Sequence, residues 1–114
     1  MEGTIKSAEE IAALFKTARK FHTDTIMALL KEHDNERGTE GRVAFIAGKR
    51  MGSAPLRNYA KRRMREAAQR SRAPWSGFDV IFVAKERLTA ASMEGIEKDM
   101  ERIRLETSAT RRID

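Results

Sequence analysis

The sequence has 114 residues, a net charge of +6 and no cysteine. Its length fits one compact domain, so we expect a single domain over residues 1–114, with a frayed tail over 107–114. A chain without cysteine excludes disulfide bonds, thiolate metal sites and a cysteine nucleophile. The N-terminal segment has no long apolar run, so we expect neither a secretory signal nor a membrane span, and a cytoplasmic location.

A capping signal and helical periodicity mark the start of the chain. Ser7 and Glu10 have the spacing of a capping box, which predicts a helix that begins at Ser7. Apolar residues then recur at helical spacing and predict one amphipathic stripe, made of Ile11, Leu14, Phe15 and Ala18.

Two strands are expected next. Residues 21–31 favour a strand, and residues 42–48 (RVAFIAG) are typical of a short strand in a sheet covered on both faces. The segment 34–41 between them is rich in Gly, Asp and Asn and predicts a flexible loop. We therefore expect the two strands to form an antiparallel pair.

The second half of the chain predicts a long helix, a strand and a last helix. After a loop over 48–55, Pro55 fits the first turn of a helix that we expect to run to about Arg70. Residues 78–84 (FDVIFVA) are the best strand candidate. A last helix from about 92 to 106 places Ile96, Met100 and Ile103 on one stripe. Interleaved helices and strands predict an α/β sandwich around a sheet.

Positive charge is concentrated in one part of the chain. Residues 42–72 hold ten Lys or Arg and one acid, Glu66, for a charge of +9, whereas the remainder carries −3. Charge gathered on one surface attracts polyanions, whereas solvated helices usually alternate signs. We therefore expect a polyanion-binding surface rather than a helix face that is merely solvated.

The expected basic helix has two distinct sides at about 100° per residue. The core-facing stripe is Leu56, Ala60, Met64 and Ala67. The outward arc is uninterrupted by acids and is made of Arg57, Asn58, Lys61, Arg62 and Arg65, with Lys49 and Arg50 extending it on a loop bracketed by glycines. Guanidinium groups bind phosphate in a bidentate way and stack on bases, so binding here should depend steeply on salt.

The order of these residues matches a known pattern. Lys49-Arg50-Met51-Gly52, then Leu56, then Arg57-Asn58, Lys61-Arg62 and Arg65-Glu66, closely resembles the signature of the bacterial ribonuclease P protein family. Phe15 falls where that family has an aromatic residue, and the segment 78–100 resembles its later strand, basic residue and final helix. The chain departs from the pattern at Tyr59, where the family often has Arg.

The resemblance implies a fold and a division of labour. The fold is an α+β two-layer sandwich with three helices on a central, mostly antiparallel sheet and a left-handed β–α–β crossover around the basic helix. The function is that of an endoribonuclease subunit in tRNA 5′ maturation, in which the RNA subunit carries the chemistry and holds Mg²⁺. The protein would bind the catalytic RNA subunit through Lys49, Arg50, Arg57, Asn58, Lys61, Arg62 and Arg65.

The resemblance also implies a second contact, with the 5′ leader of precursor tRNA. A cleft for a single strand needs stacking surface and apolar patches. The candidates are Ile11, Phe15, Met27 and Leu29. For Phe15, spacing alone favours an ordinary core residue, and the resemblance makes the two interpretations about equal.

The chain offers no protein-borne nuclease centre. His22 and His33 are isolated, and His22 is better explained as a polar residue on an exposed strand face than as a metal ligand. Asp79 is better explained as a hydrogen-bonding residue than as a metal ligand. We therefore expect no catalytic residue and no metal ligand in the protein itself.

Two other functions fit the charge of the helix. One is an architectural RNA-binding protein of the ribosome. Charge and helix geometry fit that role equally well, and only the ordered motif over residues 49–66 argues against it. The other is a DNA-binding regulator that uses the basic helix for recognition; against it, no partner helix precedes the basic helix at helix-turn-helix spacing. We expect RNA partners, and neither DNA nor a membrane.

Overall fold

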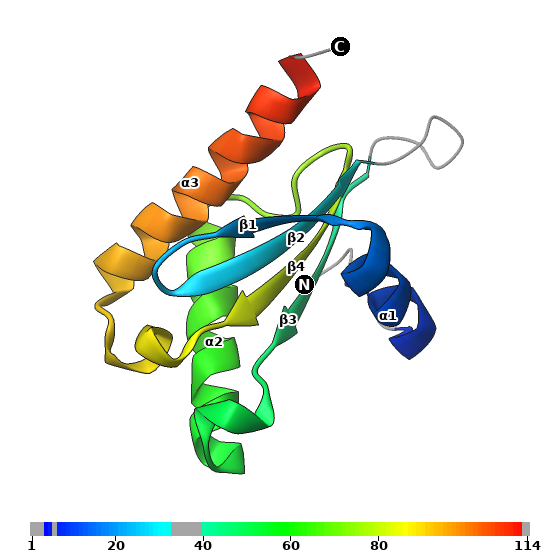
Figure 1. Ribbon diagram of the computed structural model, residues 1–114. Helices are drawn as coiled ribbons and strands as arrows, with labels where there is room; N and C mark the ends of the chain where they lie inside the picture. The colour runs from blue at the N-terminus through cyan, green and yellow to red at the C-terminus, as the bar shows by residue number, and fades with distance from the viewer. Residues whose placement is uncertain (1–3, 6, 33–39, 113–114) are drawn as a thin grey trace.

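The computed structural model describes residues 4–5, 7–32 and 40–112 (Figure 1). Its helices are α1 (Ala8–Thr17), α2 (Ala54–Arg70) and α3 (Met93–Arg112), and its strands are β1 (Arg19–His22), β2 (Ile26–Glu32), β3 (Arg42–Ile46) and β4 (Phe78–Ala84). Two 3-10 turns, η2 (Lys49–Met51) and η3 (Glu86–Ala90), follow β3 and β4. None of the described helices is long and apolar enough to cross a membrane.

The strands form one mixed sheet in the order β1-β2-β4-β3. β1 with β2 and β2 with β4 are antiparallel, and β3 with β4 is parallel, so the predicted mostly antiparallel sheet is confirmed. The predicted pairing of 21–31 with 42–48 is wrong, because β4 lies between these strands. β4 is buried on both faces, which suits a central position. The predicted loop over 34–41 lies largely outside the described residues.

The segment 21–31 forms parts of two strands rather than the single predicted strand, because a turn interrupts it. The backbone N–H and the hydroxyl of Thr23 both donate to the carbonyl of Ile26, at 2.8 and 2.9 Å. The backbone N–H and hydroxyl of Thr25 donate to one carboxylate oxygen of Asp99 in α3, at 3.0 and 2.6 Å. Threonine side chains therefore stabilise a turn here, although their β-branched shape favours strands in general.

The basic helix connects two parallel neighbours. The chain leaves β3, passes through α2 and returns as β4, which lies beside β3. In Figure 1 both strands point down the page, β4 lies to the left of β3, and α2 lies behind the sheet. This arrangement makes the crossover left-handed, against the usual preference. The carboxyl ends of β3 and β4 consequently meet at one end of the sheet, beside the first turns of α2.

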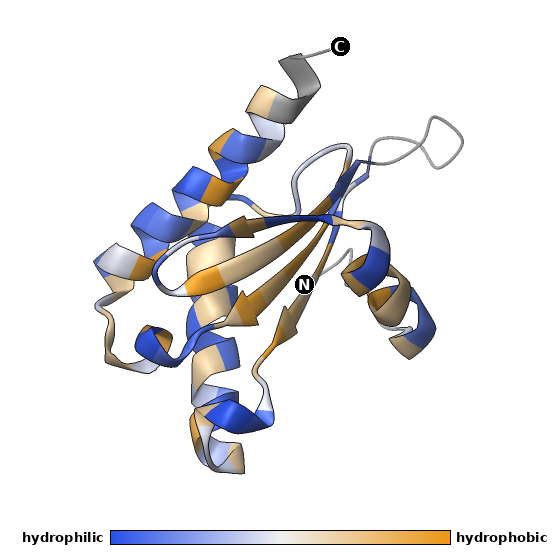
Figure 2. Cartoon of the chain, viewed as in Figure 1, coloured by the Kyte–Doolittle hydropathy of each residue, from blue (hydrophilic) through white to orange (hydrophobic). Residues whose placement is uncertain are grey.

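The two faces of the sheet pack against different helices, and the strands are the most hydrophobic part of the chain (Figure 2). α2 and α3 cover one face, whereas α1 packs on the other face. The larger core includes Ile26, Val43, Val80 and Phe82 from the sheet, Ala60, Met64 and Ala67 from α2, and Ile96, Met100 and Ile103 from α3. The smaller core, under α1, consists of Ile5, Leu14, Leu29, Ala44 and Ile81.

The predicted start of the first helix is confirmed, and its predicted stripe is confirmed in part. Ser7 caps α1, since its hydroxyl accepts the N–H of Glu10 at 3.3 Å. Leu14 is buried, but Phe15 is 39% exposed. α1 is also tied to the sheet by Arg42, which pairs with the carboxylate of Glu10.

The stripe predicted for the last helix is confirmed, because Ile96, Met100 and Ile103 have no exposed surface. The helix is longer than predicted: α3 continues to Arg112, through most of the segment expected to be a frayed tail. The first residue of that segment, Thr107, is buried, and its hydroxyl donates to the carbonyl of Arg104 at 2.6 Å.

Candidate RNA-binding surface

α2 begins and ends where the sequence predicts. Ser53 caps it by accepting the N–H of Leu56 at 3.4 Å, and proline occupies the first turn. The core-facing stripe of small residues is confirmed, with Ala60, Met64 and Ala67 fully buried. Leu56 was predicted to belong to this stripe, but it is 37% exposed. The reason is that the first turn of α2 extends past the end of the sheet, where no strand covers it (Figure 1).

The outward side of α2 presents the predicted basic face. Asn58, Arg62 and Arg65 are exposed, whereas Arg57 and Lys61 are half-buried. Arg57 donates from Nε to the carbonyl of Ala47 at 3.3 Å, which ties the helix to the chain just after β3. The structure therefore brings together all the helical residues predicted for this face: Arg57, Asn58, Lys61, Arg62 and Arg65.

The acid that follows this face on α2 does not neutralise it. Glu66 pairs with Arg70 at 2.8 Å, and Arg70 also pairs with Glu97 of α3 at 2.5 Å. Hydrogen bonding to Glu97 raises the pKa of Arg70 above its ordinary value, so Arg70 stays charged and paired with carboxylates. Within the part of the chain that the structure describes, no salt bridge involves Arg57, Lys61, Arg62 or Arg65.

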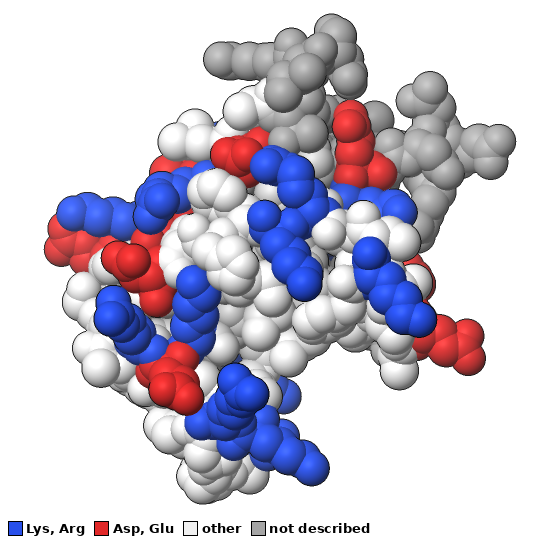
Figure 3. All heavy atoms as spheres, viewed as in Figure 1, with Lys and Arg blue, Asp and Glu red and all other residues white. Residues whose placement is uncertain are grey.

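The turn η2 extends the basic face. Lys49 and Arg50 are exposed, whereas Met51 is buried and anchors the turn. Gly52 has φ of +116°, a conformation that side-chain-bearing residues rarely adopt, so a glycine here allows the chain to turn sharply into α2. Figure 3 shows Lys and Arg side chains gathered over the lower end of α2 and this turn.

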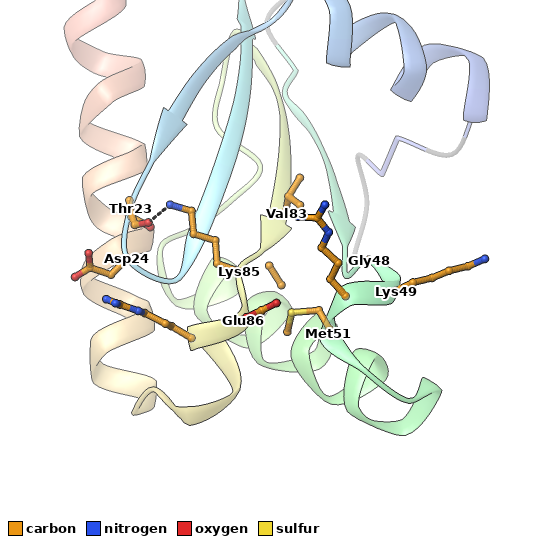
Figure 4. Close-up of a pocket in the computed structure, with 11 residues that line it drawn as sticks. Thr23, Asp24, Gly48, Lys49, Met51, Val83, Lys85 and Glu86 are labelled. Carbon is orange, nitrogen blue, oxygen red and sulfur yellow. Dashed lines mark hydrogen bonds between the residues drawn. The ribbon is translucent and has the colours of Figure 1, made fainter.

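A pocket of about 770 Å³ lies between this turn and the end of β4. Figure 4 shows Lys49 pointing away from it and Lys85 reaching across to Thr23, where its Nζ donates to the backbone carbonyl at 2.6 Å. Four more charged side chains line the pocket: Asp24, Arg50, Glu86 and Arg87. Cations from two separate segments, one after β3 and one after β4, thus meet at one end of the sheet.

Neither Lys85 nor Arg87 was predicted to belong to a site. A usable signal was present, because both follow β4 directly, as Lys49 and Arg50 follow β3. Parallel neighbours end at the same edge of a sheet, so the basic residues after each would be expected to meet. The residue pattern did not show that β3 and β4 are parallel neighbours; only the family resemblance implied it, through its β–α–β crossover.

The face of the sheet that α1 covers is partly open. Met27, Val83 and Ile46 are register partners across three neighbouring strands, and all three are half-buried. We call these three residues the apolar row. Val83 also lines the pocket beside η2, so the apolar row and the pocket are continuous. Ile46 and Val83 were not predicted as site residues.

The four residues predicted for a leader cleft do not share one environment. Ile11 and Met27 are half-buried at the edge of the smaller core, and Phe15 is exposed. Leu29 is only 1% exposed, because it lies beneath α1 in the centre of that core. Leu29 therefore offers no surface to a bound strand and contributes by packing.

The described residues contain no group of three or more His, Cys, Asp or Glu side chains arranged to hold a metal ion. His22 is exposed on β1, as predicted. Asp79 is buried on β4 and accepts hydrogen bonds from Arg42, which agrees with a structural role.

The matching family and solved structures agree with this architecture. The family model described as "Ribonuclease P" matches residues 2–107. Two relatives named "Ribonuclease P protein component" are 38% identical over 68 residues (Citrifermentans bemidjiense) and 32% identical over 83 residues (Geobacter sp. strain M21). These matches cover 60% and 73% of this chain, and 56% and 69% of the relatives.

Among solved structures, an RNase P protein from Staphylococcus aureus superimposes with a TM-score of 0.76 at 19% identity, covering 95% of this chain and 96% of that one. An RNase P protein from Thermotoga maritima gives a TM-score of 0.74 at 17% identity, covering 88% and 93% of the two chains. At such low identity these structures support the fold alone, whereas the family model covers nearly the whole sequence. The chain belongs to the ribonuclease P protein family.

Proposed function

We propose that this chain is the protein subunit of a ribonuclease P ribonucleoprotein, in which it binds the catalytic RNA subunit and the 5′ leader of precursor tRNA. It would thereby assist the Mg²⁺-dependent endonucleolytic removal of the leader. The observation that carries the proposal is the uninterrupted basic face of α2, continued by η2, in a chain that belongs to this family.

The basic face is suited to folded RNA. Among the described residues its guanidinium groups have no carboxylate partner, and those of Arg62 and Arg65 are exposed, so they are available to phosphates. Asn58 adds a neutral donor and acceptor for a sugar hydroxyl or a base edge. Each phosphate that a cation engages releases counterions, so affinity for the RNA subunit should fall steeply with salt.

The opposite side of the sheet is suited to a single strand. The apolar row and the exposed ring of Phe15 offer stacking surface beside α1. The row leads to the pocket edged by Lys49, Arg50 and Lys85, where phosphates would meet positive charge. An apolar path with cations at one end is the arrangement that a protein needs to bind a single nucleic-acid strand without sequence preference. We propose that the leader lies along this path.

The proposal assigns Mg²⁺ mainly to the RNA subunit. The described part of the protein has no carboxylate cluster that fits an octahedral Mg²⁺ site. The contribution of this chain is instead positive charge near the leader and the RNA core, which lowers repulsion between phosphates. Less Mg²⁺ is then needed to bring substrate and RNA subunit together.

Reconstitution tests the proposal. Adding the purified chain to its cognate RNA subunit at low Mg²⁺ should rescue cleavage of precursor tRNA at its 5′ end. Tight binding to structured RNA with no rescue would favour the architectural role, that of a ribosomal RNA-binding protein. Failure to bind the RNA subunit at all would overturn the proposal.

A further inference from the structure

Tyr59 is an exposed aromatic ring at the border of the basic face. It is the only tyrosine of the chain, it lies in the second turn of α2, and it is 37% exposed. Leu56, one helical turn earlier, is exposed to the same extent. Neither residue belongs to either hydrophobic core of the described chain. Packing within the protein therefore does not account for this apolar surface.

Two guanidinium groups hold the ring. The Cζ atoms of Arg62 and Arg63 lie 5.5 and 5.3 Å from the centroid of the Tyr59 ring, within the range of cation–π attraction. Arg63 is itself fixed, since its Nη1 donates to the carbonyls of Leu88 and Thr89 in η3 at 3.1 and 3.4 Å. The ring is thus oriented before any ligand arrives, which lowers the entropic cost of binding.

The chemistry around the ring favours one class of ligand. Proteins bind unpaired RNA bases by stacking them on aromatic rings and on guanidinium planes. Here a ring, a guanidinium group that belongs to the basic face, and an aliphatic side chain occupy adjacent positions on one helix. Another protein is a less favourable ligand, because the guanidinium groups of Arg62 and Arg63 border the ring and the surrounding surface is positive.

We propose that Tyr59, with Leu56 beside it, stacks on an unpaired nucleobase of the RNA subunit while Arg62 engages the adjoining backbone phosphate. The inference rests on the proposed function and adds to it a contact of a different kind. Stacking releases no counterions, so the contribution of Tyr59 to affinity is independent of salt, whereas that of Arg62 is not.

Substitutions at residue 59 separate stacking from charge. Tyr59→Phe should bind the RNA subunit as tightly as the wild type, whereas Tyr59→Leu should bind about 5- to 150-fold more weakly, the range for loss of one stacked base. The dependence of affinity on salt should be unchanged in both. Arg62→Ala is the matched control, and its salt slope should fall by about one.

The single tyrosine also allows a direct observation. Incorporation of 3-fluorotyrosine labels residue 59 alone, so one ¹⁹F resonance reports on this ring. Addition of the RNA subunit should shift that resonance through the ring current of a stacked base. The same amount of a fully paired RNA duplex, which offers no free base, should shift it much less.

The outcomes separate the two proposals. Wild-type chain that does not bind the RNA subunit contradicts the proposed function itself. Wild-type chain that binds, together with a Tyr59→Leu variant of equal affinity, overturns the stacking contact and leaves the proposed function standing. Equal ¹⁹F shifts with the RNA subunit and with the duplex would overturn it as well. Circular dichroism verifies that the Tyr59→Leu variant is folded. If that variant does not fold, the Tyr59→Phe variant provides the test, because weaker RNA binding by Tyr59→Phe would contradict stacking.

Discussion

Arg42 and Asp79 face each other across the parallel pair of β3 and β4 and are joined by two hydrogen bonds. Nε of Arg42 donates to Oδ1 of Asp79 at 3.1 Å, and Nη2 donates to Oδ2 at 2.7 Å. Arg42 also binds Glu10 of α1. The hydrogen bonds that Arg42 donates to Asp79 and Glu10 raise its pKa above the ordinary value, so the guanidinium stays charged. One side chain thus connects α1 to the two strands that bracket the basic helix.

Removal of Arg42 should destabilise the fold. Asp79 is 3% exposed, so Arg42→Ala would leave a buried carboxylate without its main partner. We expect the free energy of unfolding to fall by about 3 kcal/mol, as for other buried pairs broken on one side. Chemical denaturation measures this change. Arg104→Ala, which breaks the exposed pair with Glu101, is the control and should have a much smaller effect. Equal effects of both variants would contradict a structural role for the Arg42–Asp79 pair.

Substitution of the basic face should weaken RNA binding without unfolding the protein. Replacing Arg57, Asn58 and Arg62 together by Ala should reduce affinity for the RNA subunit and lower its salt slope by about two, because two cations are lost. Stability should change by only about 1 kcal/mol, since Arg57 alone of the three donates a side-chain hydrogen bond within the described part of the chain. Filter binding and thermal denaturation measure the two quantities.

A charge on the far side of α2 provides the control for that experiment. Arg70→Ala removes a cation of the same helix, but one that already pairs with Glu66 and Glu97. Its affinity for the RNA subunit should stay close to that of the wild type. If Arg70→Ala weakened binding as much as the triple variant did, total charge rather than the basic face would be responsible. Unfolding of the triple variant would point to a structural role for the face.

Met27 and Leu29 should behave differently, although they lie on the same face of β2. Leu29→Ala should cost about 2–5 kcal/mol of stability, because the side chain is buried under α1. Met27→Ala should cost less, because Met27 is half-buried in the apolar row, and should instead weaken binding of the leader. Denaturation and leader-length-dependent affinity measure the two effects. A leader-specific defect in a stably folded Leu29→Ala variant would contradict this assignment.

Phe15→Ala should reduce affinity for precursor tRNA with a long leader more than affinity for mature tRNA. The ring is exposed, so the loss should correspond to one stacked base, about 1–3 kcal/mol of binding free energy, with little change in stability. Dissociation constants of the reconstituted complex for the two RNAs provide the measurement. Phe15→Trp should preserve affinity. Equal losses for both RNAs would argue against a leader site beside α1.

Local signals in the sequence were sufficient for several elements. α2 and β4 have the predicted limits, because Pro55 and an uninterrupted apolar run are signals that need no distant partner. The basic face could be derived from helical geometry alone, and all of its predicted residues lie on α2. Its composition and order also identified the family.

The features that the sequence did not reveal depend on distant parts of the chain. The turn at Thr25 is held by Asp99, from α3, so propensity alone could not distinguish it from a strand. The parallel pairing of β3 with β4 is non-local, and the residue pattern alone did not predict it. The pocket beside Lys85 and the pairing of Asp79 with Arg42 both depend on it. Leu56 belongs to the helical stripe of α2 but lies beyond the end of the sheet and is therefore exposed. Its exposure depends on the length of α2 relative to the strands, which the stripe alone does not show.

We propose that the basic face of α2 lets an RNA catalyst work at limiting Mg²⁺, and single-turnover cleavage of precursor tRNA across a Mg²⁺ titration tests this role. The wild-type chain should shift cleavage by its cognate RNA subunit to lower Mg²⁺, and the Arg57/Asn58/Arg62 triple variant should lose most of that shift. A Mg²⁺ dependence identical with and without the wild-type chain would overturn this role of the basic face.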